Sequence, residues 1–110
     1  MNRKQILQCR DYLKSLGLTR WNGREWKFDD KLIHQGYCLV YEYAGEWTIY
    51  TRTEVRKWDD KYELFTNSWI DFSGELEEFK EKVNKAVDNY KKAVQKIKEL
   101  KVQEDFNEFI

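Results

Sequence analysis

Hydrophobic residues at the N-terminal end of the chain recur with the 3.6-residue period of an α-helix. The residues that would share one face are Ile6, Cys9, Leu13 and Leu16. Gly17 follows the last of them, and a glycine just beyond a final helical turn is a common stop signal because it adopts positive φ without strain. The pattern predicts an amphipathic helix over residues 3–16.

From residue 19 to residue 72 the hydrophobic period shortens to two, which is typical of β-strands. Asn22-Gly23, flanked by tryptophans, is a signal for a tight hairpin because a type I′ turn needs positive φ at both central positions. Ala44-Gly45 separates two alternating segments, 37–43 and 46–52, which are the clearest strands. The pattern predicts an antiparallel meander of three to five strands over residues 19–72.

A second helix is predicted over residues 75–101 by two interleaved series of hydrophobic residues with a seven-residue spacing. The series are Leu76, Val83, Tyr90, Ile97 and Phe79, Ala86, Ala93, Leu100. Such a helix is about 40 Å long, whereas strands of the usual five to seven residues span about 20 Å. We therefore expect part of the helix to project past the sheet, to pack on the first helix, or to meet another chain. The tail 102–110 is expected either to fold back as a short helix or to become ordered on a partner.

These elements predict an α+β fold, with a helix, a sheet and a long helix in one domain covering residues 1–110. The chain is 41% hydrophobic and 36% charged, a balance that supports a core with a solvated exterior. No apolar stretch approaches 18 residues, and residues 1–17 are amphipathic rather than typical of an export signal. We therefore expect no membrane contact and a cytoplasmic protein.

Candidate catalytic and metal-binding residues are few. His34 is the only histidine, and no nucleophile motif or metal-ligand spacing accompanies it. Cys9 and Cys38 are interpreted as small buried residues rather than as a disulfide or metal pair. The acidic pairs 29–30 and 59–60 each precede a lysine in turn-like sequence, where aspartate bonds its own backbone. We expect no enzyme activity, no cofactor and no metal; an enzyme that uses carboxylates and tyrosines without histidine is the weakest alternative.

The arginines and most of the tryptophans lie in the first part of the chain. Residues 1–57 carry 11 Lys and Arg against 7 Asp and Glu, and residues 58–110 carry 9 against 13. Tryptophan, tyrosine and arginine dominate protein-binding hot spots, and aromatic rings interleaved with cations also bind single-stranded nucleic acid. The candidate partner-binding residues are Trp21, Arg24, Trp26, Trp47, Tyr50, Arg52, Arg56 and Trp58. The alternatives are a nucleic-acid face, which four glutamates on the same strands disfavour, and rings that pack in the core.

The hydrophobic stripe of the long helix also has three interpretations. Its residues pack on the chain's own sheet and first helix, form a homodimeric coiled coil, or dock on another protein. The candidate self-association residues are Leu76, Phe79, Val83, Tyr90 and Ile97. Three heptads are a minimum for a coiled coil.

The function expected from these patterns is non-enzymatic binding of a larger protein, with nucleic-acid binding as the alternative. In general character the sequence is similar to small accessory proteins of phages and mobile elements, which include anti-CRISPR and other anti-defence inhibitors. It is rich in lysine, glutamate and aromatic residues, and it contains no proline. This similarity of type implies an inhibitor that acts by occupying a surface of a host protein.

Overall fold

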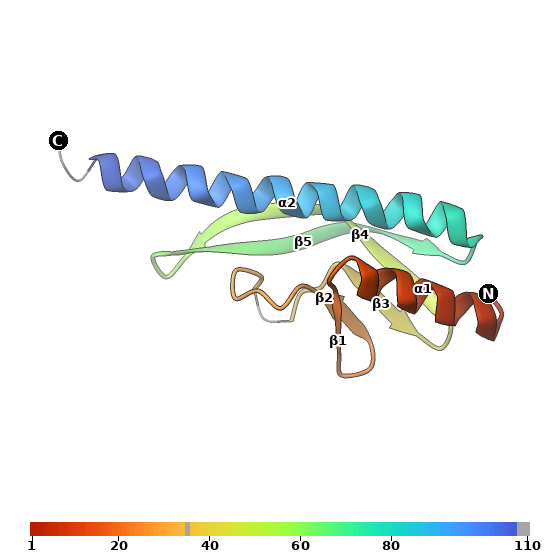
Figure 1. Ribbon diagram of the computed structural model, residues 1–110. Coiled ribbons are helices and arrows are strands. Elements are labelled where there is room, and N and C mark those ends of the chain that lie inside the picture. Colours follow the sequence, from red (N-terminus) through yellow and green to blue (C-terminus); the bar gives the residue numbers. More distant parts are fainter. Residues whose placement is uncertain (35, 108–110) are drawn as a thin grey trace.

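The structure is a computed structural model that describes residues 1–34 and 36–107 (Figure 1). It confirms the predicted α+β architecture, in which a helix, a five-stranded antiparallel meander and a long helix follow one another. The elements are α1 (Arg3–Ser15), β1 (Thr19–Trp21), β2 (Glu25–Lys27), β3 (Val40–Tyr43), β4 (Glu46–Trp58), β5 (Lys61–Phe72) and α2 (Leu76–Asn107). Neither helix within the described ranges is long and apolar enough to cross a membrane.

The strands lie in the sheet in chain order, and tight turns set their pairing. The predicted hairpin turn is present, with φ of 53° at Asn22 and 70° at Gly23. Ala44 and Gly45, at 52° and 79°, turn β3 into β4 in the same way. A left-handed turn of this kind matches the twist of the flanking strands.

Strands β4 and β5 are much longer than the sequence predicts, with 13 and 12 residues. At about 3.3 Å per residue they span roughly 40 Å, close to the roughly 48 Å of the 32-residue α2. The hairpin therefore reaches the far end of the helix, where Lys57 Nζ lies 3.0 Å from Glu104 Oε1. Strands of five to seven residues were expected, but β4 and β5 are about twice as long, so most of α2 lies along the sheet. Of the three expected arrangements of the helix, packing on the first helix is present, because the Tyr12 hydroxyl of α1 donates a hydrogen bond to Asn84 Oδ1 of α2.

The C-terminal tail was predicted as a separate segment, but residues 102–107 continue α2. Val102 is 67% exposed, so this last part of the helix adds little to the core. Residues 108–110 of the predicted tail lie outside the described residues.

One hydrophobic core joins both helices to the sheet. Helix α1 contributes Leu13, the sheet contributes Trp26 and Trp47, and α2 contributes Phe79 and Ile97, all of which are at most 1% exposed. Both helices reach this core from the same side, as the ribbon shows (Figure 1). Among the described elements, no helix covers the opposite side of the sheet around β1, β2, β3 and the first half of β4.

The helix α1 begins with a capping box. The Asn2 side chain accepts a hydrogen bond from the Gln5 backbone N–H, and the Gln5 side chain accepts one from Asn2. At its other end the chain leaves through Gly17, whose φ is 92°. The observed range 3–15 agrees with the predicted 3–16 within the usual uncertainty of helix ends.

Candidate functional site

The side of the sheet that faces away from the helices carries a group of aromatic side chains, which we call the aromatic face. Successive side chains of a strand point to opposite sides, so the neighbours of buried Trp26, Val40 and Ile49 lie on this face. Cross-strand pairing brings them into rows, because Tyr41 pairs with Glu25 and Thr48, and Tyr50 with Trp69. The members of the aromatic face are Trp21, Tyr41, Tyr43, Tyr50 and Trp69.

Three of these rings are exposed to an unusual extent. Trp69 is 63% exposed, Tyr43 55% and Trp21 44%. The described chain has only two other large hydrophobic residues this exposed, Leu7 and Val102, and both lie on helices. Three of the five exposed large hydrophobic residues of the described chain therefore lie on one face of the sheet.

Neighbouring side chains hold these rings in place. The guanidinium of Arg24 lies 4.7 Å from the centre of the Tyr43 ring, and Lys27 Nζ lies 5.0 Å from the Trp21 ring. Such cation–π contacts contribute about 0.5–1 kcal/mol at exposed sites. The Trp69 ring lies 6.3 Å from the ring of Tyr50. The rings are thus partly ordered before any partner binds, which lowers the entropic cost of binding.

The charges around the aromatic face are balanced. The cations Arg24 and Lys27 are accompanied on the same rows by Glu25, Glu46 and Asp71. A surface that binds a phosphate backbone needs an excess of cations. Burial raises the pKa of the Tyr50 hydroxyl above its usual value, and the nearby Cys38, Tyr41 and acids add to the shift. Tyr50 is therefore a neutral hydrogen-bonding group at physiological pH.

The structure divides the eight predicted partner-binding residues. Trp21, Arg24 and Tyr50 lie on or beside the aromatic face. Arg52 and Arg56 are exposed on the second half of β4, beyond this face. Trp58 ends β4, and its side chain lies outside the described part of the chain.

Two of the predicted partner-binding residues, Trp26 and Trp47, lie in the core instead. They are 0% and 1% exposed, because each lies on the strand side that faces the helices. The Trp47 ring packs 5.0 Å from the ring of Phe79. These two residues support the sheet and are not available to a partner.

The sequence prediction missed three residues of the aromatic face, Tyr41, Tyr43 and Trp69. The signal that could have found Trp69 is the register of the β4–β5 hairpin, which pairs it with Tyr50. Tyr43 lies at the end of β3 beside the tight turn, where the alternation alone did not separate surface from core.

The candidate self-association residues of α2 face the chain's own sheet. Phe79, Val83, Tyr90 and Ile97 are at most 4% exposed, and Leu76 is partly buried against the same core. A coiled coil through these residues would have to remove them from that core. The stripe is therefore explained by internal packing, the first of its three interpretations.

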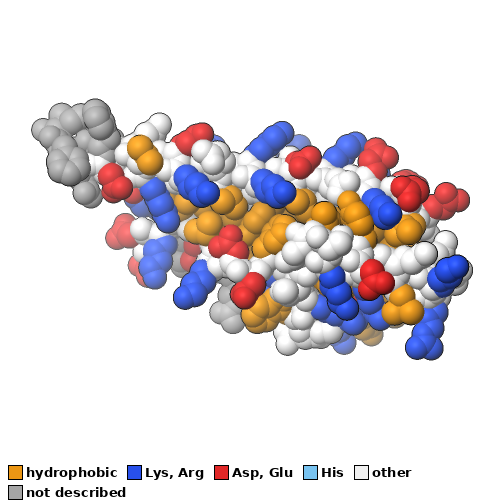
Figure 2. All heavy atoms as spheres, viewed as in Figure 1, with side chains coloured by type: hydrophobic (Ala, Val, Ile, Leu, Met, Phe, Trp, Pro, Cys, Tyr) orange, Lys and Arg blue, Asp and Glu red, His pale blue; other side chains and the backbone are white. Residues whose placement is uncertain are grey.

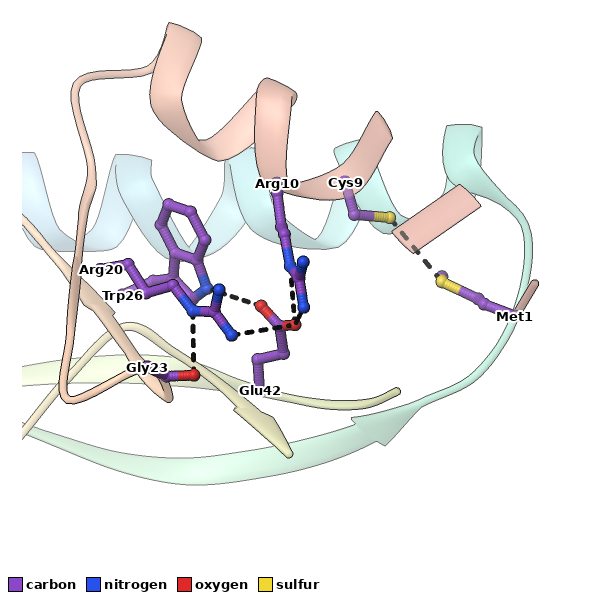
Figure 3. A network of polar contacts seen from close by, with 7 residues as sticks. All are labelled: Met1, Cys9, Arg10, Arg20, Gly23, Trp26 and Glu42. Atoms are coloured by element: carbon purple, nitrogen blue, oxygen red, sulfur yellow. Dashed lines mark hydrogen bonds and ion pairs between the residues drawn. The ribbon is translucent and has the colours of Figure 1, made fainter. Parts of the chain in front are cut away.

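A buried carboxylate, that of Glu42, lies between α1 and the first strands (Figure 3). It is 3% exposed and accepts hydrogen bonds from Arg10 Nε at 2.8 Å and from Trp26 Nε1 at 3.1 Å. Arg20 Nη2 lies 3.5 Å from Glu42 Oε2. The hydrogen bond with Glu42 raises the pKa of the Arg10 guanidinium. Two cations and an indole N–H occupy the oxygens of this carboxylate, so its role is to join α1 to β1, β2 and β3.

Both cysteines are buried free thiols. Burial, with a smaller effect of Glu42, raises the pKa of Cys9 to about 11. Burial also raises the pKa of Cys38 to about 12. Thiols react as thiolates, so both are inert at neutral pH. The Cys9 thiol donates a hydrogen bond to the Met1 sulfur at 3.7 Å (Figure 3).

Contacts of His34 connect the loop between β2 and β3 to β5. Its ring stacks on Phe65, with the two centres 4.7 Å apart, and its Nδ1 contacts the Glu63 carboxylate. Its backbone N–H donates to the Leu64 carbonyl at 2.8 Å. These contacts extend the free edge of β5 with the segment around Ile33.

The two acidic pairs lie in turns, as their sequence context indicates. Asp59 and Asp60 have φ of 49° and 61° between β4 and β5. Asp30 accepts a hydrogen bond from the Leu32 N–H at 2.9 Å and another from the Tyr90 hydroxyl at 2.9 Å. No group of three or more potential metal ligands occurs within residues 1–34 and 36–107.

A shallow groove runs along one side of α2 and appears in Figure 2 as a band of hydrophobic side chains beneath the helix. Its volume is about 590 Å³, and its apolar wall is formed by Phe28, Tyr90 and Val94. The Phe28 and Tyr90 rings lie 5.0 Å apart, so they close the floor of the groove. Lys91 and Lys98 line its rim.

Among these surfaces, the aromatic face is the one that combines exposed tryptophan and tyrosine with ordered cations. It is therefore the candidate functional site. Comparison with protein-family models, with curated proteins and with solved structures finds no match to this chain.

Proposed function

We propose that this chain is a non-enzymatic binding module that engages a larger protein through its aromatic face. The observation that supports the proposal most strongly is the exposure of Trp21, Tyr43 and Trp69 on one uncovered side of the sheet. Tryptophan, tyrosine and arginine are the residues that most often dominate the energy of a protein interface. Large apolar rings gathered on a surface commonly mark an interaction site.

The balanced charge of this face favours a protein over a nucleic acid. Exposed rings can stack on bases, but Glu25, Glu46 and Asp71 would repel a phosphate backbone running across the same rows. Nucleic-acid binding therefore stays the second candidate, supported only by the rings and by Arg24 and Lys27.

Inhibition of a host protein is the specific form of this function that the composition suggests. An inhibitor of this kind, such as a phage anti-defence protein, acts by covering a surface and needs no catalytic group. A rigid sheet with ordered rings suits such a role, because binding then orders few side chains.

The proposal is tested by comparing one triple variant and one double variant in binding assays with host extracts. Trp21→Ala, Tyr43→Ala and Trp69→Ala together remove the exposed rings of the aromatic face. Leu7→Ala with Val102→Ala removes the exposed hydrophobic residues of the helices and serves as the control. A protein retained by the wild type and the control but lost by the triple variant supports the proposal.

Two outcomes would contradict it. One is a partner that binds the triple variant as well as the wild type. The other is binding of labelled single-stranded oligonucleotides that weakens steeply with salt and depends on the same rings, which would establish the second candidate.

A further inference from the structure

The second half of β4 has one edge that pairs with β5 and another that no strand covers. Strand β3 pairs only with residues 46–49 of β4, whereas β4 pairs with β5 as far as Trp58. Beyond Tyr50, whose N–H donates to the Leu39 carbonyl, the outer edge of β4 is therefore open.

The direction of the backbone groups along this edge follows from Leu64, the β5 partner of Val55. The Leu64 N–H donates to the Leu32 carbonyl, and its carbonyl accepts from the His34 N–H, both at 2.8 Å. The backbone N–H and C=O of Leu64 thus point away from β4. In an antiparallel ladder, two directly opposite residues that do not bond each other both direct their N–H and C=O groups away from the partner strand. The N–H and C=O of Val55 therefore point to the open edge of β4. Those of Thr53 and Lys57, two residues away on either side, point the same way.

These outward groups have no hydrogen-bond partner within the described residues. The Thr53 hydroxyl beside them is also buried without a partner. Unpaired backbone groups along a strand edge are a template for pairing with another strand.

A groove of about 580 Å³ lies along this edge, between β4 and α2. Helix α2 contacts β4 more than any other strand, and it runs beside β4 in Figure 1. The cations of the groove are Arg52 from the strand and Lys92 and Lys96 from the helix. Its one acid, Glu54, is paired with Arg56 at 3.1 Å, and hydrogen bonds from Asn67 and Arg56 lower the pKa of that carboxyl.

We propose that the groove between β4 and α2 binds an extended acidic segment of another protein, which adds to the sheet as a strand beside Thr53–Lys57. The strand edge supplies the alternating backbone donors and acceptors that recognise a peptide. Arg52, Lys92 and Lys96 supply the charge that selects glutamate and aspartate over lysine. Strand addition in a groove beside a helix is an established way of binding peptides.

A second copy of this chain fits the groove less well, because pairing two β4 edges would bring both sets of cations together. A phosphate backbone also fits less well, because it offers no alternating N–H and C=O groups to the strand edge. The surface is separate from the aromatic face, so each proposal can fail without the other.

The probe is a short fluorescein-labelled peptide in which glutamate alternates with valine, and its binding is followed by fluorescence anisotropy. We expect Lys92→Glu with Lys96→Glu to weaken binding by about tenfold or more. Lys91→Glu with Lys98→Glu is the matched control, because these lysines line the other groove of the same helix; it should change binding by less than about twofold. All four lysines are exposed, so the folds of both variants should be intact.

Two further peptides test the strand pairing itself. In one peptide the odd-numbered residues are N-methylated, and in the other the even-numbered ones, so each lacks the backbone N–H donors along one of its two edges. One of the two peptides should lose binding, because only one edge of the bound strand faces β4. Amide resonances of Thr53 and Val55 should shift on addition of the unmodified peptide and not on addition of the inactive one.

The proposal is overturned if both methylated peptides bind as well as the parent, or if the two lysine pairs have equal effects. It is also overturned if the amide resonances of Thr53 and Val55 shift when only the protein concentration is raised, because that result would place a second copy in the groove. Tighter binding of a single-stranded oligonucleotide than of the acidic peptide at the same lysines would overturn it as well.

Discussion

The side chain of Asn89 on α2 donates a hydrogen bond of 2.7 Å from Nδ2 to the main-chain oxygen of Thr51 on β4. The contact lies where the long hairpin is interrupted, because Thr51 and Ser68 are not paired although the residues on either side are. Ser68 has a φ of 54°, in the left-handed region, and its carbonyl accepts a hydrogen bond from the Thr51 hydroxyl. Two side chains therefore satisfy the Thr51 and Ser68 carbonyls at the break.

Substitution of Asn89 tests the importance of this contact. We expect Asn89→Ala to lower the free energy of unfolding by about 1 kcal/mol, the usual net contribution of such a hydrogen bond. Asp88→Ala, at the adjacent exposed position, should cost less than about 0.5 kcal/mol. Urea unfolding followed by tryptophan fluorescence measures both. Equal effects of the two substitutions would show that the contact adds no stability beyond helix propensity.

Removal of one cation from the buried Glu42 should destabilise the protein strongly. Arg10→Met leaves a carboxylate that is 3% exposed with only Arg20 and Trp26 as partners. We expect a loss of about 2–4 kcal/mol, at the lower end of the range for a broken buried pair because two partners stay.

Replacement of both partners should cost less than removal of Arg10 alone. In the double variant Arg10→Met with Glu42→Met no charge is left buried, and part of the lost stability should return. Thermal and urea unfolding of the two variants make the comparison. A double variant less stable than Arg10→Met would show that the pair itself, and not the stranded charge, is responsible.

Truncation of two tryptophans in the same hairpin should lower stability by very different amounts. Trp47 is 1% exposed and packs on Phe79, so Trp47→Ala should cost about 3–5 kcal/mol. Trp69 is 63% exposed, so Trp69→Ala should cost less than about 1 kcal/mol. Urea midpoints with an unchanged slope are the measurement. A large loss for Trp69→Ala would mean that this ring serves stability and would weaken its assignment to a binding face.

The buried thiols predict a loss of stability at alkaline pH. Burial raises the pKa of Cys9 to about 11 and that of Cys38 to about 12, whereas thiols of the unfolded chain ionise near pH 8.5. The unfolded state therefore loses protons first, and stability should fall as the pH rises from about 9 towards 12. The pKa of the Tyr90 hydroxyl, raised by burial and by its bond to Asp30, acts in the same direction above about pH 10.

Thermal unfolding between pH 7.5 and pH 11 measures this dependence. In the variant Cys9→Ala with Cys38→Ala the slope against pH should be smaller, even though the protein is less stable overall. A thiol reagent should leave both cysteines unmodified in the native protein and modify both in urea. A steady Tm up to pH 11 would contradict the assignment of two protonated thiols to the core.

The two helices and the meander were predictable because their periods and turn residues are local signals. The length of β4 and β5 was not, because between Arg52 and Trp58 the only large hydrophobic residue is Val55, too few for a clear strand pattern. The pairing of this segment becomes visible only together with residues 61–67. The helix was therefore predicted to be longer than its sheet, with part of it projecting, packing on the first helix or meeting another chain.

Part of the candidate site was also predictable. The residue types of the aromatic face were identified, but the sequence could not assign Trp26 and Trp47 to the core and Trp69 to the surface. Each strand has two sides with aromatic residues, and the choice between them depends on where the helices dock. That information lies in the pairing of distant segments rather than in any one of them.

The order of the strands in the sheet also bears on how quickly the chain folds. Every strand pairs with the next one along the chain, so each pairing closes a short loop and contact order is low within the sheet. The sequence contains no proline, so no slow peptide-bond isomerisation delays the native state. The Tyr12 hydroxyl on α1 donates a hydrogen bond to Asn84 on α2, 72 residues further along the chain. Docking of the two helices over a preformed meander would then be the step that sets the rate.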